Sequence, residues 1–528
     1  MKYNSVFDII GPIMVGPSSS HTAGAARIGH AARALFGQEP ERAEIHLYGS
    51  FARTYMGHAT DVALIAGILG FNTNDPRISR ATAIAKQRGV YIALHLEEVP
   101  ADHPNTARIR LSRGEDHLEL VGVSVGGGRV EIVELNGFRL RLAGGQTAVL
   151  VFHHDRPGAI AAVASVFAGH QVNIAHMEVS RKTPGGQALM IIEGDQSPQA
   201  ALLEAVSALP FVWKVCTIDD WKRTGSPDLQ APAGEPFRDV AELVRRAERD
   251  GMPISEVMIR QEVEVSGRSR AAVLAEMEMS LQVMQEAIER GMRGGIRSVS
   301  GLTGGDAELL RRYIERGTTL SGQTVLGSVA RALATNEVNA AMGTICATPT
   351  AGSAGVVPGV LFTLREQLKL EQDEALRFLL TAGAFGLVVA NNACISGAAG
   401  GCQAEIGSAI GMAAAAAVEV AGGTARQSAE AMAIALKSVM GLVCDPVGGL
   451  VEIPCVKRNG IGAAIALVAA DLALAGVESR IPCDEVIAAM HSVGQALPAA
   501  LRETGLGGLA ATPMGRELER RVFAPKRT

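Results

Sequence analysis

The sequence has few aromatic residues and no long uninterrupted apolar run. Only 4% of its 528 residues are Phe, Trp or Tyr, whereas 60 are glycine and 48% are hydrophobic. This composition excludes a disordered chain and favours a globular protein whose helices pack closely on small side chains. At this length we expect several domains with separate cores.

Neither a membrane span nor a targeting segment is indicated. Residues 1–10 lack the basic start and apolar stretch of a signal peptide. The longest apolar windows contain Arg377 and Asp471, and none has the roughly 20 uninterrupted residues that a span requires. A formal net charge of −5 gives no electrostatic reason to expect nucleic acid or a membrane surface as partner. The sequence therefore predicts a cytoplasmic protein.

The seven cysteines do not have the pattern of a disulfide framework. An odd count in a long chain without a signal segment favours reduced thiols. A Cys-x-x-Cys pair is also missing, so the spacing indicates neither a ferredoxin-type cluster nor a zinc ribbon. Each cysteine is therefore either a small core residue or a ligand in a less regular site.

The first 144 residues have mixed periodicity. Residues 44–49 and 90–96 alternate like strands, whereas 61–70 form an apolar helical run. A meander of strands follows at 107–142, interrupted by Gly-rich turns. We therefore predict an α+β domain containing a sheet over residues 1–144.

Residues 145–222 have strand and helix signals in the order β-α-β-β-α-β, which is that of the ferredoxin-like motif. The wording HHDRPG at 153–158, followed by VNI at 172–174, resembles ACT domains, small regulatory modules that bind amino acids. In ACT domains of serine-controlled enzymes, three residues of these motifs contact the amino acid. The resemblance places those contacts at His153, Asp155 and Asn173 of this chain. Asp155 stands where Asn is usual, so the ligand stays open.

The composition changes sharply after residue 222. Segment 223–236 is rich in Pro, Ala and Gly, which is typical of a linker. Beyond it, apolar residues recur at helical spacing, as at Val273, Met277, Leu281, Met284 and Ile288. Since residues 237–528 have no alternating strand pattern, we predict an all-α domain there. Such a change is typical of two fused polypeptides.

Three cysteines lie in Gly-rich breaks between the expected helices. Cys402 comes at the start of a helix, and Cys444 and Cys455 flank a segment of Gly and Pro residues that allows the backbone to fold tightly. A cysteine at a helix N-terminus gains from the helix dipole, which stabilises the thiolate form that binds metals. By spacing alone, these residues fit buried structural thiols as well as ligands.

Seven short motifs are spread over almost the whole chain. They are GPSSSHT at 16–22, GHATD at 57–61, SGLTGGD at 300–306, TPTAG at 348–352, GCQ at 401–403, CDPV at 444–447 and PCVKRN at 454–459. In these motifs and their order the chain resembles the iron–sulfur L-serine dehydratases. The N-terminal part is similar to the β subunit of that family, and the C-terminal part is similar to the α subunit. An ACT domain between the halves is similar to the two-subunit form of the family, here fused.

The resemblance implies a [4Fe–4S] cluster held by Cys402, Cys444 and Cys455. Three thiolates leave one iron open to act as a Lewis acid on the β-hydroxyl of L-serine. A base removes the α-hydrogen, water leaves, and pyruvate and ammonia result, which would feed gluconeogenesis. The open iron implies oxygen sensitivity. Some single-chain members end in a self-inhibitory cysteine, but residues 523–528 contain none.

The general base is expected to be a histidine of the N-terminal region. Of 12 histidines, only His491 follows the linker. His58 is the first choice and His21 the second, because both lie in motifs shared with the family. A capping or loop role for either, and a carboxylate or Lys457 as base, remain alternatives.

Hydroxyl and amide side chains in Gly- and Ala-rich loops are candidates for holding the serine carboxylate and amine, with turn and capping roles as the alternative. These candidates are Ser18, Ser19, Ser20, Thr350, Asn392 and Ser396. The remaining cysteines match no ligand position of the family and are interpreted as structural. These are Cys216, Cys346, Cys394 and Cys483.

Three other functions are compatible with parts of the sequence. A pyridoxal-phosphate lyase requires a Schiff-base lysine near a phosphate cup, but none of the four lysines after the linker follows a strand near one. A cluster enzyme could instead act on another β-hydroxy amino acid or on a hydroxy acid, and threonine remains open as a side substrate. An amino-acid sensor built on the ACT domain would leave three cluster-type cysteines unexplained. We expect a homodimer and add a monovalent cation as a further candidate cofactor.

Overall fold

The computed structural model describes residues 3–142, 147–194, 198–218 and 235–523. It contains two compact units. The helical unit comprises Met1–Ser19, Met56–His58 and Pro232–Thr528, and the mixed unit comprises Ser20–Tyr55 and Ala59–Ala231. The predicted 1–144 domain is therefore not one unit of the structure. Two of its segments, 1–19 and 56–58, belong to the helical unit, and the rest belongs to the mixed unit. The predicted linker, 223–236, lies outside the described residues except for its last two positions.

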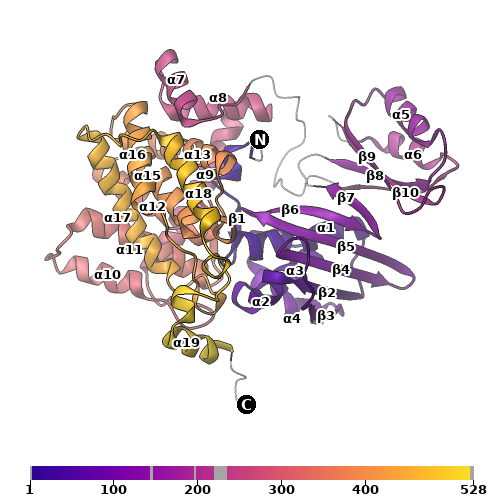
Figure 1. Ribbon diagram of the computed structural model, residues 1–528, viewed down its shortest axis with the longest axis horizontal. Coiled ribbons are helices and arrows are strands. Elements are labelled where there is room, and N and C mark those ends of the chain that lie inside the picture. Colours follow the sequence, from indigo (N-terminus) through magenta and orange to yellow (C-terminus); the bar gives the residue numbers. More distant parts are fainter. Residues whose placement is uncertain (1–2, 143–146, 195–197, 219–234, 524–528) are drawn as a thin grey trace. The chain divides into compact units, whose positions relative to one another are not determined.

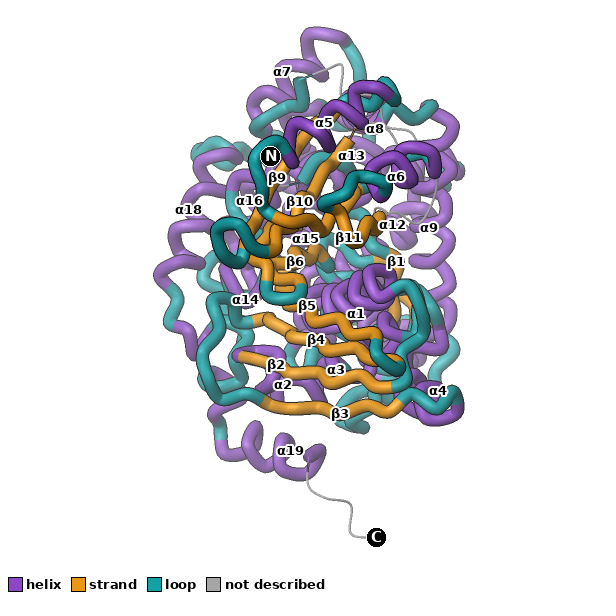
Figure 2. The backbone as a smooth tube through the Cα atoms, turned by 90° about the vertical axis from the view of Figure 1, so that its right-hand side faces the viewer, coloured by secondary structure: helices purple, strands orange, loops and turns teal. Residues whose placement is uncertain are grey.

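A six-stranded sheet forms the first part of the mixed unit (Figure 2), with strand order β3-β2-β4-β5-β6-β7. β2 and β3 are parallel and the other neighbouring strands are antiparallel. The strands are β2 (Arg42–Tyr48), β3 (Tyr91–Leu96), β4 (Asn105–Arg113), β5 (Asp116–Gly126), β6 (Arg129–Leu135) and β7 (Phe138–Leu142). This arrangement confirms the predicted α+β class.

Helices α1 (Gly24–Phe36) and α3 (Thr60–Ile68) of this unit pack closely because each contributes a glycine. A Cβ added at Gly29 would lie 2.2 Å from the Leu64 carbonyl oxygen, and one at Gly67 would lie 2.0 Å from the Ala26 oxygen. α2 (Gly49–His58) precedes α3, and Ala59 between them has a positive φ of 51°. The division between the units falls within α2, after Tyr55.

The second part of the mixed unit has the predicted β-α-β-β-α-β order. Its sheet has the order β11-β8-β10-β9 with antiparallel neighbours throughout. The elements are β8 (Ala148–His154), α5 (Ala159–Gly169), β9 (Ile174–Arg181), β10 (Gln187–Gly194), α6 (Ala200–Ser207) and β11 (Val212–Ile218). The apolar faces of α5 and α6 bury Phe167 and Leu202 against this sheet.

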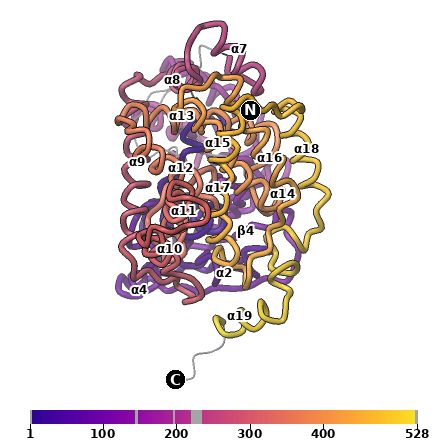
Figure 3. Tube along the Cα trace, turned by 90° about the vertical axis from the view of Figure 1, so that its left-hand side faces the viewer, coloured from indigo at the N-terminus to yellow at the C-terminus, as the bar shows by residue number. Residues whose placement is uncertain are grey.

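The helical unit is a bundle with one large core, as predicted from its helical periodicity (Figures 1 and 3). The predicted apolar face at 273–288 is buried on α9. The helices are α7 (Val240–Asp250), α8 (Ile254–Ser266), α9 (Arg270–Met292), α10 (Asp306–Glu315), α11 (Gln323–Ala340), α12 (Val356–Leu368), α13 (Gln372–Asn392), α14 (Gly397–Gly400), α15 (Ser408–Val420), α16 (Ala425–Ser438), α17 (Cys455–Leu474), α18 (Cys483–Ala496) and α19 (Pro513–Phe523).

The first residues of the chain complete this bundle. Val6 and Ile9 are buried in its core, and the Glu262 carboxylate on α8 accepts hydrogen bonds from the Val6 N–H and the Ser5 hydroxyl. Strand β1 (Ile13–Val15) pairs with β12 (Thr344–Cys346). β12 corrects the expectation of a purely helical 237–528. Its three residues are too few to give an alternating pattern, and they form a strand only through pairing with a distant segment.

None of the described helices is both long and apolar enough to cross a membrane.

Candidate metal centre

Three breaks between helices carry the predicted cysteine ligands, and all three side chains are buried. Cys402 lies between α14 and a π-helical turn, Gln403–Gly407, that leads into α15. Cys444 follows α16, and Cys455 begins α17. The exposed fractions of the three are 2%, 3% and 6%, respectively.

Gln403 connects the loops around Cys402 and Cys444. Its side-chain amide donates to the carbonyls of Gly400 and Met490, each at 3.0 Å, and its Oε1 accepts from the Gly441 N–H at 2.8 Å. Its own backbone N–H donates to the Leu442 carbonyl. Because this buried amide uses both ends, it fixes the two cysteine loops against each other.

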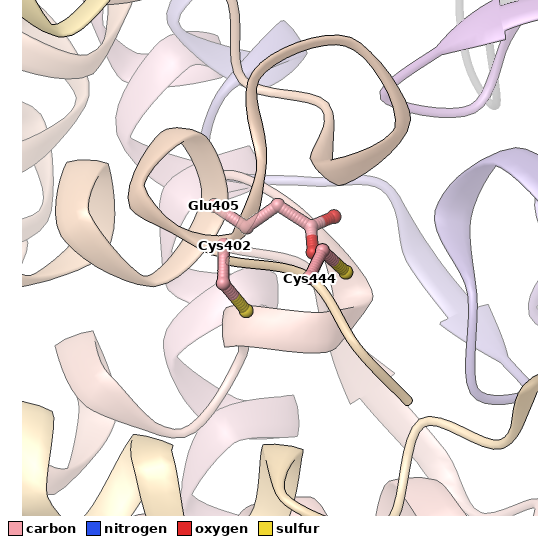
Figure 4. Close-up of side chains that lie close together, drawn as sticks. All are labelled: Cys402, Glu405 and Cys444. Atoms are coloured by element: carbon pink, nitrogen blue, oxygen red, sulfur yellow. The ribbon is translucent and has the colours of Figure 1, made fainter. Parts of the chain in front are cut away.

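Cys402, Cys444 and Glu405 form a group of potential metal ligands. Their sulfur and carboxylate oxygen atoms all lie within 4.8 Å of one another. Figure 4 shows the three side chains close together, with the Glu405 carboxylate beside Cys444. Cys455 is outside this group of three but is electrostatically close to it, because the Cys402 thiolate adds to the rise in the pKa of Cys455 that burial causes. The three predicted cysteines therefore meet in one region of the helical unit.

Negative charge at this centre is unfavourable without a cation. The neighbouring Cys402 and burial raise the pKa of the Cys444 thiol well above its usual value. Burial is the main cause of the raised pKa of Cys455, with Cys402 adding to it and the Arg458 cation opposing it. A site that gathers thiolates in this way is one that a bound metal would stabilise.

Two carboxyl groups border the sulfur atoms. Glu405 accepts hydrogen bonds from the Thr350 hydroxyl and the Gly397 N–H, and burial raises its pKa to about 7. Glu503 is 6% exposed, and burial together with Glu405 and Cys402 raises its pKa well above the usual value. Glu405 lies three residues after Cys402 in the sequence, whereas Glu503 lies in no motif shared with the family.

Arg458 brings a positive charge to the same centre. Its guanidinium lies beside Cys402, forms an ion pair of 2.9 Å with the buried Asp445, and donates to the Val443 carbonyl at 2.7 Å. Although burial alone would lower the pKa of Arg458, Cys402 and Asp445 raise it overall. The pair therefore keeps a permanent cation next to the thiols.

The C-terminal segment before α19 covers the Cys444 loop. The Cys444 N–H donates to the Leu501 carbonyl, and the Glu503 N–H donates back to the Cys444 carbonyl at 2.8 Å. Asp445 accepts from the Leu509 N–H at 2.8 Å. Gly508 allows this approach, because its φ is +59° and an added Cβ would lie 2.4 Å from the Asp445 carboxylate. This bridge buries the cysteine loop.

The donor set fits an iron–sulfur cluster. Three buried cysteines lie at the junctions of rigid helices, which supplies the soft thiolate ligands that such clusters require. The adjacent Arg458 offsets part of the negative charge. Glu405 brings a carboxylate oxygen to the same place, which the sequence analysis did not predict.

His58 belongs to the helical unit, although it is remote in sequence from the cysteines. It is the last residue of α2 and is fully buried. A Cβ added at Gly57 would lie 3.1 Å from the Leu450 side chain and 3.3 Å from the Gly448 carbonyl oxygen. This end of α2 therefore contacts the loop between Cys444 and Cys455. Burial lowers the pKa of His58 to about 4.

His21 belongs to the mixed unit, where both of its ring nitrogens have hydroxyl partners. Nδ1 lies 3.0 Å from the Ser20 Oγ, and Nε2 lies 2.9 Å from the Ser50 Oγ at the start of α2. The ring also contacts Phe51 edge-on, with centroids 5.2 Å apart. These contacts fit a role for His21 in positioning α2 better than they fit a role as general base.

The candidate substrate ligands fall into two groups. Ser18, Ser19 and Thr350 are buried in the helical unit, and Ser396 directly precedes Gly397, which contacts Glu405. Ser20 belongs to the mixed unit.

Among the described residues, no hydrogen bond connects Asn392 to the three cysteines. It is exposed at the end of α13, and its amide donates to the Arg238 carbonyl at 2.9 Å.

The ACT-type residues lie at the end of β8 and beyond it. His153 is 1% exposed and its ring stands edge-on to Phe211, whereas Asn173 is exposed. The Asp155 carboxylate accepts from the Gly185 N–H at 2.9 Å and pairs with Arg181 at 3.2 Å. Asp155 therefore stabilises the turn between β9 and β10, which limits its availability to a ligand.

The other four cysteines are not members of the Cys402–Cys444–Glu405 group found among the described residues. Burial raises the pKa of Cys216 to about 11 and that of Cys346 to about 12, and it raises the pKa of Cys483 well above its usual value. The Cys394 sulfur packs against Gly400, where an added Cβ would lie 2.6 Å away. Cys216, Cys346 and Cys483 therefore fit the structural interpretation.

Fold and site together define a multidomain protein whose helical part has a buried, sulfur-rich site of the kind that binds metals. Three family models match the chain in order: the serine dehydratase beta chain over residues 5–88, the ACT domain over 147–211, and the serine dehydratase alpha chain over 249–510.

Curated relatives agree with these matches. A probable L-serine dehydratase alpha chain of Bacillus subtilis is 63% identical over 287 residues, which cover 54% of this chain and 95% of the relative. The probable beta chain of the same organism is 56% identical over 220 residues, covering 42% of this chain and all of the relative. An L-serine dehydratase of Streptomyces coelicolor is 31% identical over 526 residues, covering 96% and 98% of the two chains. The chain therefore belongs to the L-serine dehydratase family, with beta-type, ACT and alpha-type regions in one polypeptide.

Proposed function

We propose that this protein is an L-serine dehydratase that converts L-serine to pyruvate and ammonia with a [4Fe–4S] cluster held by Cys402, Cys444 and Cys455. The observation that carries the proposal is the meeting of the Cys402 and Cys444 thiols with the Glu405 carboxylate within 4.8 Å, in a chain of the L-serine dehydratase family. A bound cluster with three cysteine ligands would supply a Lewis-acidic iron that polarises the serine β-hydroxyl.

The residues around the cysteines prepare the site for an anionic cofactor and a polar substrate. Arg458 offers a fixed positive charge beside Cys402 and Cys455, and Asp445 holds its guanidinium in place. Glu405 orients the 348–352 motif through the Thr350 hydroxyl. Together these contacts hold the polar groups of the site in place before the substrate enters, which reduces the reorganisation needed for reaction.

His58 is the proposed base. Because burial lowers its pKa to about 4, the imidazole is neutral at neutral pH and has a nitrogen that can accept the α-proton of serine. The loss of water then leaves an aminoacrylate, which tautomerises and hydrolyses to pyruvate and ammonia. Lys457 is less suited to this role, because its ammonium group is paired with Asp306.

The ACT domain supports a further proposal of control by an amino acid. His153 has a buried ring at the end of β8, where the family's ligand contacts map. A homodimer formed through this domain and a cytoplasmic role in supplying pyruvate are part of the same proposal.

The test is an assay of pyruvate formation from L-serine by the full chain purified without oxygen. We expect activity that is lost in air and returns after anaerobic treatment with Fe²⁺ and thiol, in parallel with iron and sulfide content. Activity that is indifferent to air and depends on added pyridoxal phosphate would overturn the cluster proposal. If protein with full iron content did not convert L-serine, the proposal that L-serine is the substrate would be wrong.

A further inference from the structure

Two buried asparagines near the C-terminal end of helix α11 have amide groups that are incompletely hydrogen-bonded. Asn336 is 3% exposed, and among the described residues neither its Nδ2 nor its Oδ1 has a hydrogen-bond partner. Asn339, 1% exposed, donates through Nδ2 to the Ala351 carbonyl at 2.9 Å, but its Oδ1 accepts nothing from that same part of the chain. A buried polar atom left unpaired costs free energy, so a cluster of such atoms calls for an explanation.

Packing shows where Asn336 faces. α11 runs antiparallel to α12: an added Cβ at Gly359 would contact the Ser328 carbonyl, one at Gly355 would contact Ala332, and Asn339 bonds to Ala351. Asn336 is one turn beyond Ala332 on the same face, because residues four apart on a helix are neighbours. It therefore faces the segment between Ala351 and Gly355.

Helix α17 borders the same face (Figure 3). An added Cβ at Gly460 would contact Val329 and Leu333 of α11, and α17 begins only five residues earlier, at Cys455. Val456, in the first turn of α17, packs in one cluster with Leu333 and Ala334 of α11. Asn336 follows Ala334 by two residues, so its turn of α11 lies close to the end of α17 that carries a proposed cluster ligand.

The segment from Thr348 to Gly355 connects these groups to the metal centre. Asn339 holds it on the α11 side, and Asn459 holds it on the α17 side through the Gly352 carbonyl and the Gly355 N–H. An added Cβ at Gly352 would lie 3.3 Å from the Glu405 carboxylate. Thr348 in this segment is fully buried, and its Oγ1 also has no partner within the described part of the chain.

Asn459 provides a contrast within the same segment. It is as deeply buried as Asn336, but its Oδ1 accepts from Gly355 and its Nδ2 donates to both Gly352 and Cys455. A purely structural asparagine at this place therefore satisfies its whole amide. Among the described residues, Asn336 and the Oδ1 of Asn339 are left without such partners.

We propose that Asn336, Asn339 and Thr348 form the subsite that holds the α-carboxylate and α-ammonium of the amino-acid substrate. The Asn336 Nδ2 and the Thr348 hydroxyl supply donors for the carboxylate, and the two asparagine Oδ1 atoms supply acceptors for the ammonium. The side chain of the substrate then points past Gly352 to the Glu405 side. This assignment rests on the proposed function and adds to it the residues that recognise the polar head.

The test uses Asn336→Leu and Thr348→Val, which remove the polar atoms at similar volume. L-alanine is the probe, because it has the same polar head as serine but no β-hydroxyl. Loss of a hydrogen bond to a charged group should raise the KM for L-serine and the Kd for L-alanine about 10- to 100-fold in each variant. We expect kcat to stay within about threefold and iron content to stay unchanged.

Stability separates this role from a structural one. Because both variants remove an unpaired buried group, their melting temperatures should equal or exceed that of the parent chain. Ser428→Ala is the control, since Ser428 on α16 is likewise buried and unpartnered among the described residues but lies on a different helix. It should leave KM, Kd and kcat unchanged.

Each result decides between the two proposals. Unchanged L-alanine affinity in both stable variants would overturn the subsite, whether or not the chain dehydrates serine. If the variants bind L-alanine more weakly but the parent chain does not convert serine, the subsite proposal stands and the proposed reaction is wrong. Should Asn336→Leu fail to fold, its role would be structural, and Thr348→Val alone would decide the rest of the subsite.

Discussion

The metal centre and the ACT region differ in how their polar residues are used. At the metal centre, groups from positions 402 to 503 converge between helices, and most of them are buried. In the ACT region, Asp155 and its partners Arg181 and Gly185 belong to one compact module, and the ion pair is partly open to solvent. The comparison teaches that the same residue types have strong mutual effects only where water is excluded.

The largest difference between the two regions is expected when one cysteine thiol is removed from each of them. Cys444→Ala should lower serine turnover on the order of 1,000-fold, because the site loses a ligand of a group expected to supply several kcal/mol of transition-state stabilisation. Cys216→Ala in β11 is the matched control and should keep full activity. Iron and sulfide per chain, measured beside turnover, should fall only in the first variant. Equal iron content in the two variants would contradict the role of Cys444 as a cluster ligand.

The next largest difference is expected between substitutions of the two buried histidines, His58 and His153. His58→Ala should reduce kcat by about 100- to 10,000-fold, the range for loss of a general base, with iron content unchanged. His153→Ala should leave turnover without an effector intact and change only the response to added amino acids. Steady-state rates with and without such amino acids measure both. Near-normal turnover by the His58 variant would remove this residue from the mechanism.

The two ion pairs offer a comparison of stability. Arg458→Met leaves the buried Asp445 carboxylate without its partner, which should cost about 3–5 kcal/mol of unfolding free energy. Arg181→Met breaks an exposed pair with Asp155 and should change stability little. Denaturant unfolding of the cluster-free chains gives both values. A small effect at Arg458 would mean that Asp445 is held by Leu509 alone.

The smallest effect should be a pH dependence centred on Glu262. Burial raises its pKa to about 7, above the value near 4.5 expected when unfolded, so between these values the folded chain binds more protons. Its contribution to stability is therefore present below pH 4.5 and is lost as the pH rises through 7, by up to about 3 kcal/mol. Glu262→Gln should flatten this dependence in denaturant titrations. Asp155→Asn should not, because the Gly185 N–H and Arg181 lower the pKa of that carboxyl.

Local patterns in the sequence were sufficient for most of the fold. The β-α-β-β-α-β order and the apolar face at 273–288 were both predicted, because each arises from periodicity within a short segment. The strand β12 was not, since it depends on pairing with β1, which lies over 300 residues away in sequence. The grouping of residues 56–58 with the helical unit has the same cause.

For the site, the sequence by itself determined which cysteines to consider, because Cys402, Cys444 and Cys455 lie in Gly-rich breaks with motifs of the family. Only the tertiary structure decided what surrounds them. Glu405, Glu503 and the Asp445–Arg458 pair border the thiols, and the buried amide of Asn336 has no hydrogen-bond partner within the described part of the chain. The physical reason is that burial and hydrogen-bond satisfaction are properties of packing between distant segments, whereas a motif records only neighbours along the chain.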